Sequence, residues 1–77
     1  MMEHKKRIKL SATEDVKEFV ESASRCDFDI DVFYNRVIVD AKSILGVLSL
    51  DLSKKLTVMY GGVNSDFEMT LHKFQTA

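Results

Sequence analysis

The sequence of 77 residues contains no proline and no tryptophan. It has only three glycines and one cysteine, Cys26. A lone cysteine excludes an intrachain disulfide bond. No apolar stretch reaches the roughly 20 residues that a membrane-spanning helix needs, and the longest, 44–50, is interrupted by a glycine and a serine. The first residues, 1–4, are not followed by the apolar run of a secretory signal. We therefore expect a cytoplasmic protein without membrane insertion.

The net charge of the sequence is also small. Lysine and arginine nearly balance aspartate and glutamate, which leaves a formal charge of −1 and no field that would attract nucleic acid. The one basic cluster alternates with apolar residues near the amino terminus, as in a strand with one wet face; it comprises Lys5, Lys6, Arg7 and Lys9. We interpret it as that solvated face. Length and composition predict one folded domain over residues 1–77.

Period-two alternation of apolar and polar residues predicts four strands. The alternation covers residues 6–10, 27–34, 37–41 and 55–60. Asn35-Arg36 is a short polar break between the second and third segments, so these two strands are expected to form a tight hairpin. Gly61-Gly62 is expected to end the last strand.

Helical spacing predicts three helices between and after these strands. Ser11 and Glu14 have the spacing of a capping box, as do Ser65 and Glu68, and an amphipathic stripe follows each pair. The two stripes consist of Val16, Phe19, Val20 and Ala23, and of Phe67, Leu71 and Phe74. Residues 43–50 break the alternation and are expected to form a short, mostly apolar helix containing Gly46.

The resulting order is βαββαβα. It predicts an α+β open-faced β-sandwich, in which helices cover one face of a four-stranded antiparallel sheet. The other face is expected to carry Asp29, Asp31, Lys55 and Thr57. A ferredoxin-like fold has similar elements but lacks the closing helix.

The run from Val39 to Leu50 resembles the HPr family, the histidine-containing phosphocarriers of the bacterial sugar phosphotransferase system. The matching positions are Lys42, Ser43, Ile44, Gly46, Ser49 and Leu50. The resemblance implies the HPr-like open-faced sandwich and a small cytoplasmic shuttle. In the family, a histidine at the start of the first helix accepts a phosphoryl group, with a neighbouring arginine to neutralise it.

The sequence departs from the family pattern at that point. Counting back from Ser43 without a gap places Ala12 at the histidine position, Glu14 at the arginine position and Asp15 at the proline position. Glu14 and Asp15 would occupy the positive end of the helix dipole and repel an incoming phosphate. We therefore expect no catalytic residue here and no enzyme activity.

Other titratable residues are weaker candidates. His4 is expected to lie in a frayed terminus, and His72 to be a surface residue paired with Glu68 one turn earlier. Two histidines and one cysteine lack metal-ligand spacing, so no metal or other cofactor is predicted. The carboxylates that alternate along the strands are interpreted as a solvated face; they are Asp27, Asp29, Asp31 and Asp40.

The second helix carries the features of the family that are retained. The resemblance implies that Ser43 is a site of regulatory phosphorylation, whereas its residue type alone also fits a helix N-cap. Ile44, Leu45 and Leu48 match the patch by which family members dock partner proteins. Val47 and Leu50 are the expected inward pair.

Three functions remain open from the sequence. The leading hypothesis is a non-catalytic HPr-like regulatory or protein-binding module whose partners are phosphotransferase-system enzymes or regulators. The second is a working phosphocarrier that uses His4 or His72. The third is a structural protein that self-associates through Ile44, Leu45 and Leu48.

Overall fold

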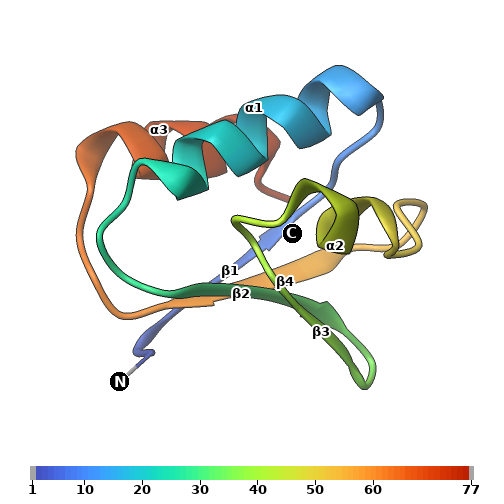
Figure 1. Cartoon of the computed structure of the whole chain (residues 1–77), viewed down its shortest axis with the longest axis horizontal. Helices are drawn as coiled ribbons and strands as arrows, with labels where there is room; N and C mark the ends of the chain where they lie inside the picture. The colour runs from blue at the N-terminus through green and yellow to red at the C-terminus, as the bar shows by residue number, and fades with distance from the viewer. Residues whose placement is uncertain (1, 77) are drawn as a thin grey trace.

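The computed structural model describes residues 2–76 and shows the predicted order βαββαβα (Figure 1). The helices and strands are β1 (His4–Ile8), α1 (Thr13–Ser24), β2 (Ile30–Tyr34), β3 (Val37–Asp40), α2 (Ile44–Leu48), β4 (Leu56–Tyr60) and α3 (Ser65–Phe74). The closing helix α3 is present, so the α+β sandwich is confirmed and the ferredoxin-like alternative is excluded.

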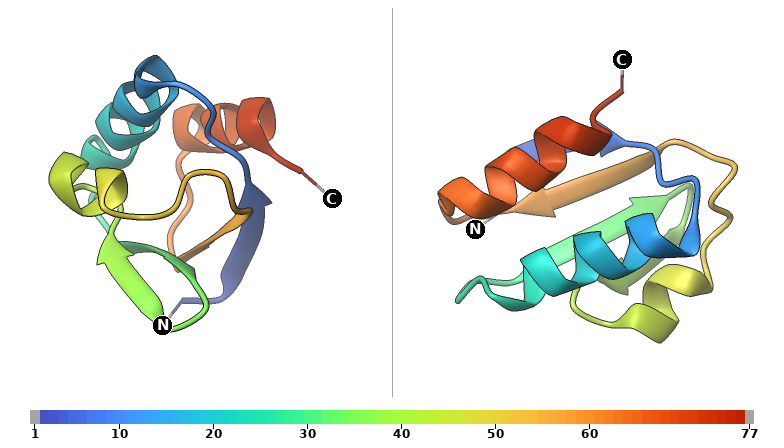
Figure 2. Two further views of the ribbon diagram at one scale, coloured as in Figure 1. Left: turned by 90° about the vertical axis from the view of Figure 1, so that its right-hand side faces the viewer. Right: turned by 90° about the horizontal axis from the view of Figure 1, so that it is seen from above.

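The four strands form one antiparallel sheet in the order β1-β4-β2-β3. The first strand therefore pairs with the last one, and β4 lies in the middle of the sheet. All three helices lie over one face, and α2 lies beside α1 (Figure 2). Among residues 2–76, no helix lies over the opposite face of the sheet (Figure 1).

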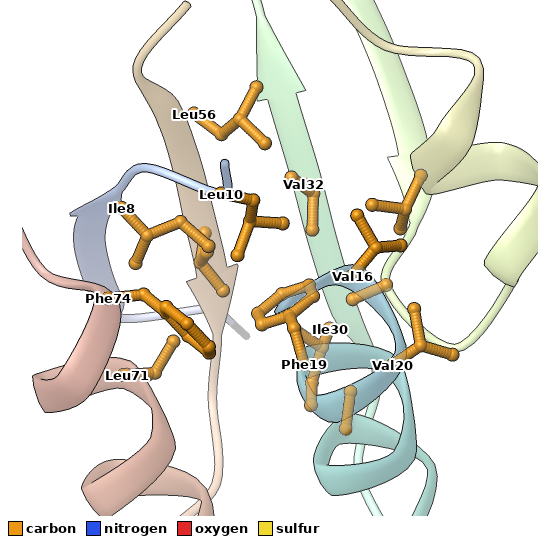
Figure 3. Close-up of a cluster of buried hydrophobic side chains, with 14 of the residues drawn as sticks. Ile8, Leu10, Val16, Phe19, Val20, Ile30, Val32, Leu56, Leu71 and Phe74 are labelled. Carbon is orange, nitrogen blue, oxygen red and sulfur yellow. The ribbon is translucent and has the colours of Figure 1, made fainter. Parts of the chain in front are cut away.

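The core fills the space between the sheet and the helices. Every second residue of the strands points toward the helices, so Ile30 and Val32 of β2 and Val58 of β4 are buried. They meet the predicted stripes of α1 and α3 (Figure 3). Both stripes are fully or almost fully buried, which confirms the helical spacing found in the sequence.

At two positions the backbone conformation or the packing restricts which residue type is tolerated. Asn35, in the predicted hairpin turn, has a positive φ of 51°, a left-handed conformation that asparagine tolerates better than most residues. At Gly62 an added Cβ would lie 2.1 Å from a ring carbon of Phe28. Only glycine allows the aromatic ring to lie this close to the backbone.

The first strand differs from its prediction. It begins at His4 rather than at Lys6, and the His4 ring packs against Tyr60 with the ring centroids 5.0 Å apart. The prediction of a frayed His4 is therefore wrong. Leu10 lies beyond the strand but is fully buried, which is why the alternation extended to it.

The carboxyl-terminal segment continues the sheet beyond β1. The Thr76 N–H donates to the carbonyl of Arg7, and the Lys9 N–H donates to the carbonyl of Phe74, both at 2.9 Å. A bridge between Ile8 and Gln75 lies between these two bonds. Within residues 2–76, no helix has the length and apolar character to cross a membrane.

Candidate functional site

The amino end of α1 is capped by a carboxylate. Ala12 is the N-cap residue, with an extended backbone and no side chain that can accept a hydrogen bond. The Asp15 side chain reaches back instead, and its Oδ2 accepts hydrogen bonds from the N–H of Ser11 at 3.0 Å and of Ala12 at 3.2 Å. Two backbone donors at this helix end are therefore already satisfied from within the chain.

Neither helix is capped by the predicted pair of residues, and each cap is displaced by one residue. In α1, Asp15 rather than Glu14 provides the carboxylate, and Ser11 only donates its N–H. In α3 the N-cap is Asn64 rather than Ser65, and its side chain accepts from the N–H of Phe67 at 2.9 Å. The residue that caps a helix is the one whose backbone turns extended just before the first helical turn, which spacing alone does not decide.

Ser43 is the N-cap of α2, as its residue type suggested. Its Oγ accepts from the N–H of Gly46 at 3.0 Å, and the residue is exposed. A Cβ at Gly46 would lie 3.2 Å from this Oγ and 3.3 Å from the Cβ of Val39. Glycine at position 46 thus leaves room for the capping serine against β3.

The residue before Ser43 ties α2 to α1. The Lys42 ammonium donates to the carbonyl of Cys26, just beyond the end of α1, at 2.9 Å. The Lys42 N–H donates to Oδ1 of Asp40. Sequence reasoning did not find the Lys42 to Cys26 contact, because it joins residues that only the fold brings together.

Burial raises the pKa of the Cys26 thiol.

The short helix α2 divides into a buried and an exposed side. Val47 is fully buried and Leu50 almost so, which confirms the predicted inward pair. Leu45 is 78% exposed, and Ile44 and Leu48 are also exposed. We call Ile44, Leu45 and Leu48 the α2 patch. Large apolar side chains gathered on one short surface helix are a feature of interaction sites.

Neither histidine reaches the amino end of α1. His4 begins β1, whose other end leads to α1, and the starts of these two elements lie at opposite ends of the molecule (Figure 1). His72 is exposed on α3, where the adjacent Lys73 forms an ion pair with Glu18 of α1. Within residues 2–76, no hydrogen bond or ion pair involves the imidazole of His72.

The predicted pairing of His72 with Glu68 is wrong. Oε2 of Glu68 accepts a hydrogen bond from the hydroxyl of Tyr60 instead, at 2.5 Å. Burial raises the pKa of Tyr60, and the hydrogen bond to Glu68 raises it further. The Glu68 carboxylate thus accepts a hydrogen bond from a residue of β4, eight positions earlier in the sequence. The spacing of residues within one helix does not predict such a contact.

The strand carboxylates do not form a cluster. Asp27, Asp29 and Asp40 are exposed and Asp31 is half-buried. Over residues 2–76, histidine, cysteine, aspartate and glutamate side chains nowhere gather in a group of three that would suit a metal ion.

Comparison with known proteins identifies the family of this chain. A family model described as "PTS HPr component phosphorylation site" matches residues 5–72. This chain belongs to the HPr family. Members of the HPr family are phosphocarriers of the phosphotransferase system.

Two solved HPr proteins have the same fold. The phosphocarrier protein HPr from Bacillus anthracis str. Ames is 25% identical, with a TM-score of 0.70 over 94% of this chain and 96% of the other. HPr-C-His from Thermoanaerobacter tengcongensis is 29% identical, with a TM-score of 0.71 over 95% of this chain and 89% of the other. The HPr fold thus extends over nearly the whole chain.

Proposed function

We propose that this chain is a non-catalytic member of the HPr family that binds partner proteins and is regulated at Ser43. The observation that carries the proposal is the Asp15 carboxylate, which occupies the backbone donors of Ser11 and Ala12 at the start of α1. This is the helix end at which the family resemblance places the phosphoacceptor histidine. Here that position is Ala12, and Glu14 replaces the arginine.

The chemistry of phosphoryl transfer explains why this helix end is unsuited to it. A phosphoryl acceptor needs a nucleophile and positive charge for the phosphate oxygens. The first turn of α1 offers a methyl group and two carboxylates, Glu14 and Asp15. The carboxylates already compensate the helix dipole and would repel a phosphate by the same field.

The α2 patch supports the protein-binding half of the proposal. Its three apolar residues are exposed although Val47 and Leu50 of the same segment are buried. The expected partners are phosphotransferase-system enzymes or regulators, because the family resemblance assigns docking to these positions. Loss of phosphotransfer at α1 would leave this patch unchanged.

Ser43 adds a means of regulation beside the patch. Its hydroxyl is exposed, precedes Ile44, and already lies against the N–H of Gly46. A phosphate on this oxygen would add about 1.5 to 2 negative charges next to the patch. We expect phosphorylation to change partner affinity, with little effect on the fold, because the amino end of a helix tolerates negative charge.

Phosphoryl labelling tests the loss of transfer chemistry. The protein is incubated with phosphoenolpyruvate and the phosphoenolpyruvate-dependent enzyme of the system, with a histidine-bearing HPr as the positive control. We expect no acid-labile phosphate on this chain. Labelling that disappears in His4→Ala or His72→Ala would refute the proposal and show a working phosphocarrier.

Docking is tested on the patch itself. Leu48→Asp is expected to weaken binding to a phosphotransferase-system partner at least tenfold, since it places a charge inside the apolar contact. Val63→Asp is the matched control, because Val63 is 83% exposed in the loop before α3. Equal binding by Leu48→Asp and the unmodified protein would contradict the assignment of the patch.

A further inference from the structure

The face of the sheet opposite the helices carries two rows of side chains that cross all four strands. In antiparallel sheets, directly paired residues point to the same face. The register places Asp40, Asp31, Met59 and Lys5 in one row, from β3 to β1, and Ile38, Phe33, Thr57 and Arg7 in the next. We call these eight residues the open sheet face.

Charge on the open sheet face is divided between its two sides. Asp40 and Asp31 lie on β3 and β2, while Lys5 and Arg7 lie on β1 at the other edge. Lys5 and Asp40 are three strand spacings apart, about 14 Å, which exceeds a Debye length of about 10 Å. Lys5 and Asp40 are thus too distant to neutralise each other within the chain.

The two central strands place two apolar side chains on the open sheet face, beside Asp31 and Thr57. Phe33 and Met59 lie on the two central strands, and both are only half-buried. Ile38 on the edge strand is 64% exposed. The face therefore has exposed apolar side chains between Asp40 on one edge strand and Lys5 and Arg7 on the other.

We propose that the open sheet face binds a second copy of this chain across a two-fold axis parallel to the strands. Such an axis reverses the order of strands across the interface, so that β1 of one copy lies over β3 of its partner. Lys5 then meets Asp40 of the other copy, and this contact occurs twice by symmetry. The Arg7 stem covers Ile38 of the other copy, Phe33 lies over Thr57, and Met59 lies over Asp31.

The other two-fold arrangement in this plane is electrostatically unfavourable. An axis perpendicular to the strands would place β1 over β1 and β3 over β3. Lys5 would then approach Arg7, and Asp40 would approach the acidic flank of the second copy. The division of charge thus selects one orientation, in the way that complementary flanks fix the register of interfaces.

The size of the face predicts a weak dimer. The molecule measures 27 × 25 × 25 Å, so a flat face buries less than about 700 Å² per copy. This is at the lower limit for specific interfaces, and the contact should be concentration-dependent. The proposal is independent of the proposed function, because the α2 patch lies in the helical layer on the other side of the sheet.

A charge swap provides the test. Self-association is measured by sedimentation velocity over concentrations that bracket about 0.1 mM, the scale of a weak interface. Lys5→Glu and Asp40→Lys are each expected to lower the association constant about tenfold, because two symmetric attractions become repulsions. The double variant is expected to regain the original constant, and the two single variants should associate when mixed.

The controls separate the open sheet face from other surfaces at which two copies could meet. Lys17→Glu on α1 makes the same change in net charge as Lys5→Glu and is expected to leave association unchanged. A chain that is monomeric throughout the concentration range would overturn the proposal, as would a double variant that fails to recover. Loss of association in Leu48→Asp, with no effect of Lys5→Glu, would place self-association on the α2 patch instead and equally overturn it.

Discussion

Asp15→Ala is expected to weaken the amino end of α1 by an amount that the structure allows to be estimated. The substitution removes the acceptor of two backbone hydrogen bonds, at 3.0 and 3.2 Å. A cap of this kind contributes about 1 kcal/mol, and a carboxylate near the helix dipole adds about 0.3 to 1 kcal/mol. We therefore expect the free energy of unfolding to fall by about 1 to 2 kcal/mol.

That loss is large for a chain of this length. Typical stabilities per residue give roughly 4 to 12 kcal/mol for 77 residues. A loss of 1 to 2 kcal/mol should lower Tm by roughly 5 to 15 °C. Urea titration followed by circular dichroism gives the free energy, and thermal unfolding gives Tm.

Two further variants separate the hydrogen bonds from the charge. Asp15→Asn keeps an acceptor oxygen without the charge and is expected to lose less than Asp15→Ala. Glu14→Gln removes a charge from the same turn, where Glu14 makes no cap, and should cost only the dipole contribution of about 0.3 to 1 kcal/mol. If Glu14→Gln costs as much as Asp15→Ala, the cap is not the source of the stability and the account of this helix end is refuted.

Three other outcomes follow from contacts in the core. Gly62→Ala is expected to cost about 1 to 3 kcal/mol in a denaturant titration, because its Cβ would collide with the ring of Phe28; an unchanged midpoint would show that the ring moves freely. Tyr60 has a raised pKa, so its contribution to stability is complete below the ordinary tyrosine pKa of 10 and is lost as the pH rises further. Above pH 10, the free energy of unfolding should therefore fall less steeply with pH in Tyr60→Phe than in the unmodified protein. Identical dependences on pH in this range would contradict the prediction. The Cys26 thiol is buried with a raised pKa, and we expect it to react with a thiol reagent only after denaturant is added; rapid reaction of the folded protein would show that it is accessible.

Periodicity predicted the order of elements because burial repeats with a fixed spacing in each of them. The stripe of α1 and the alternation in β2 and β4 are dictated by which side faces the core, and a sequence records this directly. The same logic separated Val47 from Leu48 within α2. The side of each helix or strand that faces the core was therefore predictable from residues close together in the sequence.

Contacts between distant residues were not predictable in this way. His72 follows Glu68 by one helical turn, yet Glu68 accepts a hydrogen bond from Tyr60, which only the packing of α3 against β4 brings near. The shift of both caps by one residue has a similar cause, because overlapping Ser, Asn, Asp and Glu positions offer several caps. The path of the backbone before each helix selects among them.

The pairing of β1 with β4, and of residues 75 and 76 with β1, constrains how the chain can be synthesised and folded. The edge strand β1 is synthesised before its partner, so it can pair only after residues 56–60 have been made. The end of β1 is covered only after Thr76 has been made. Closure over so many residues is slow compared with hairpin formation. During translation, the β2–β3 hairpin and α1 are therefore expected to assemble while β1 is still without a partner strand, and the sheet is completed only after residues 56–60 and 75–76 have left the ribosome.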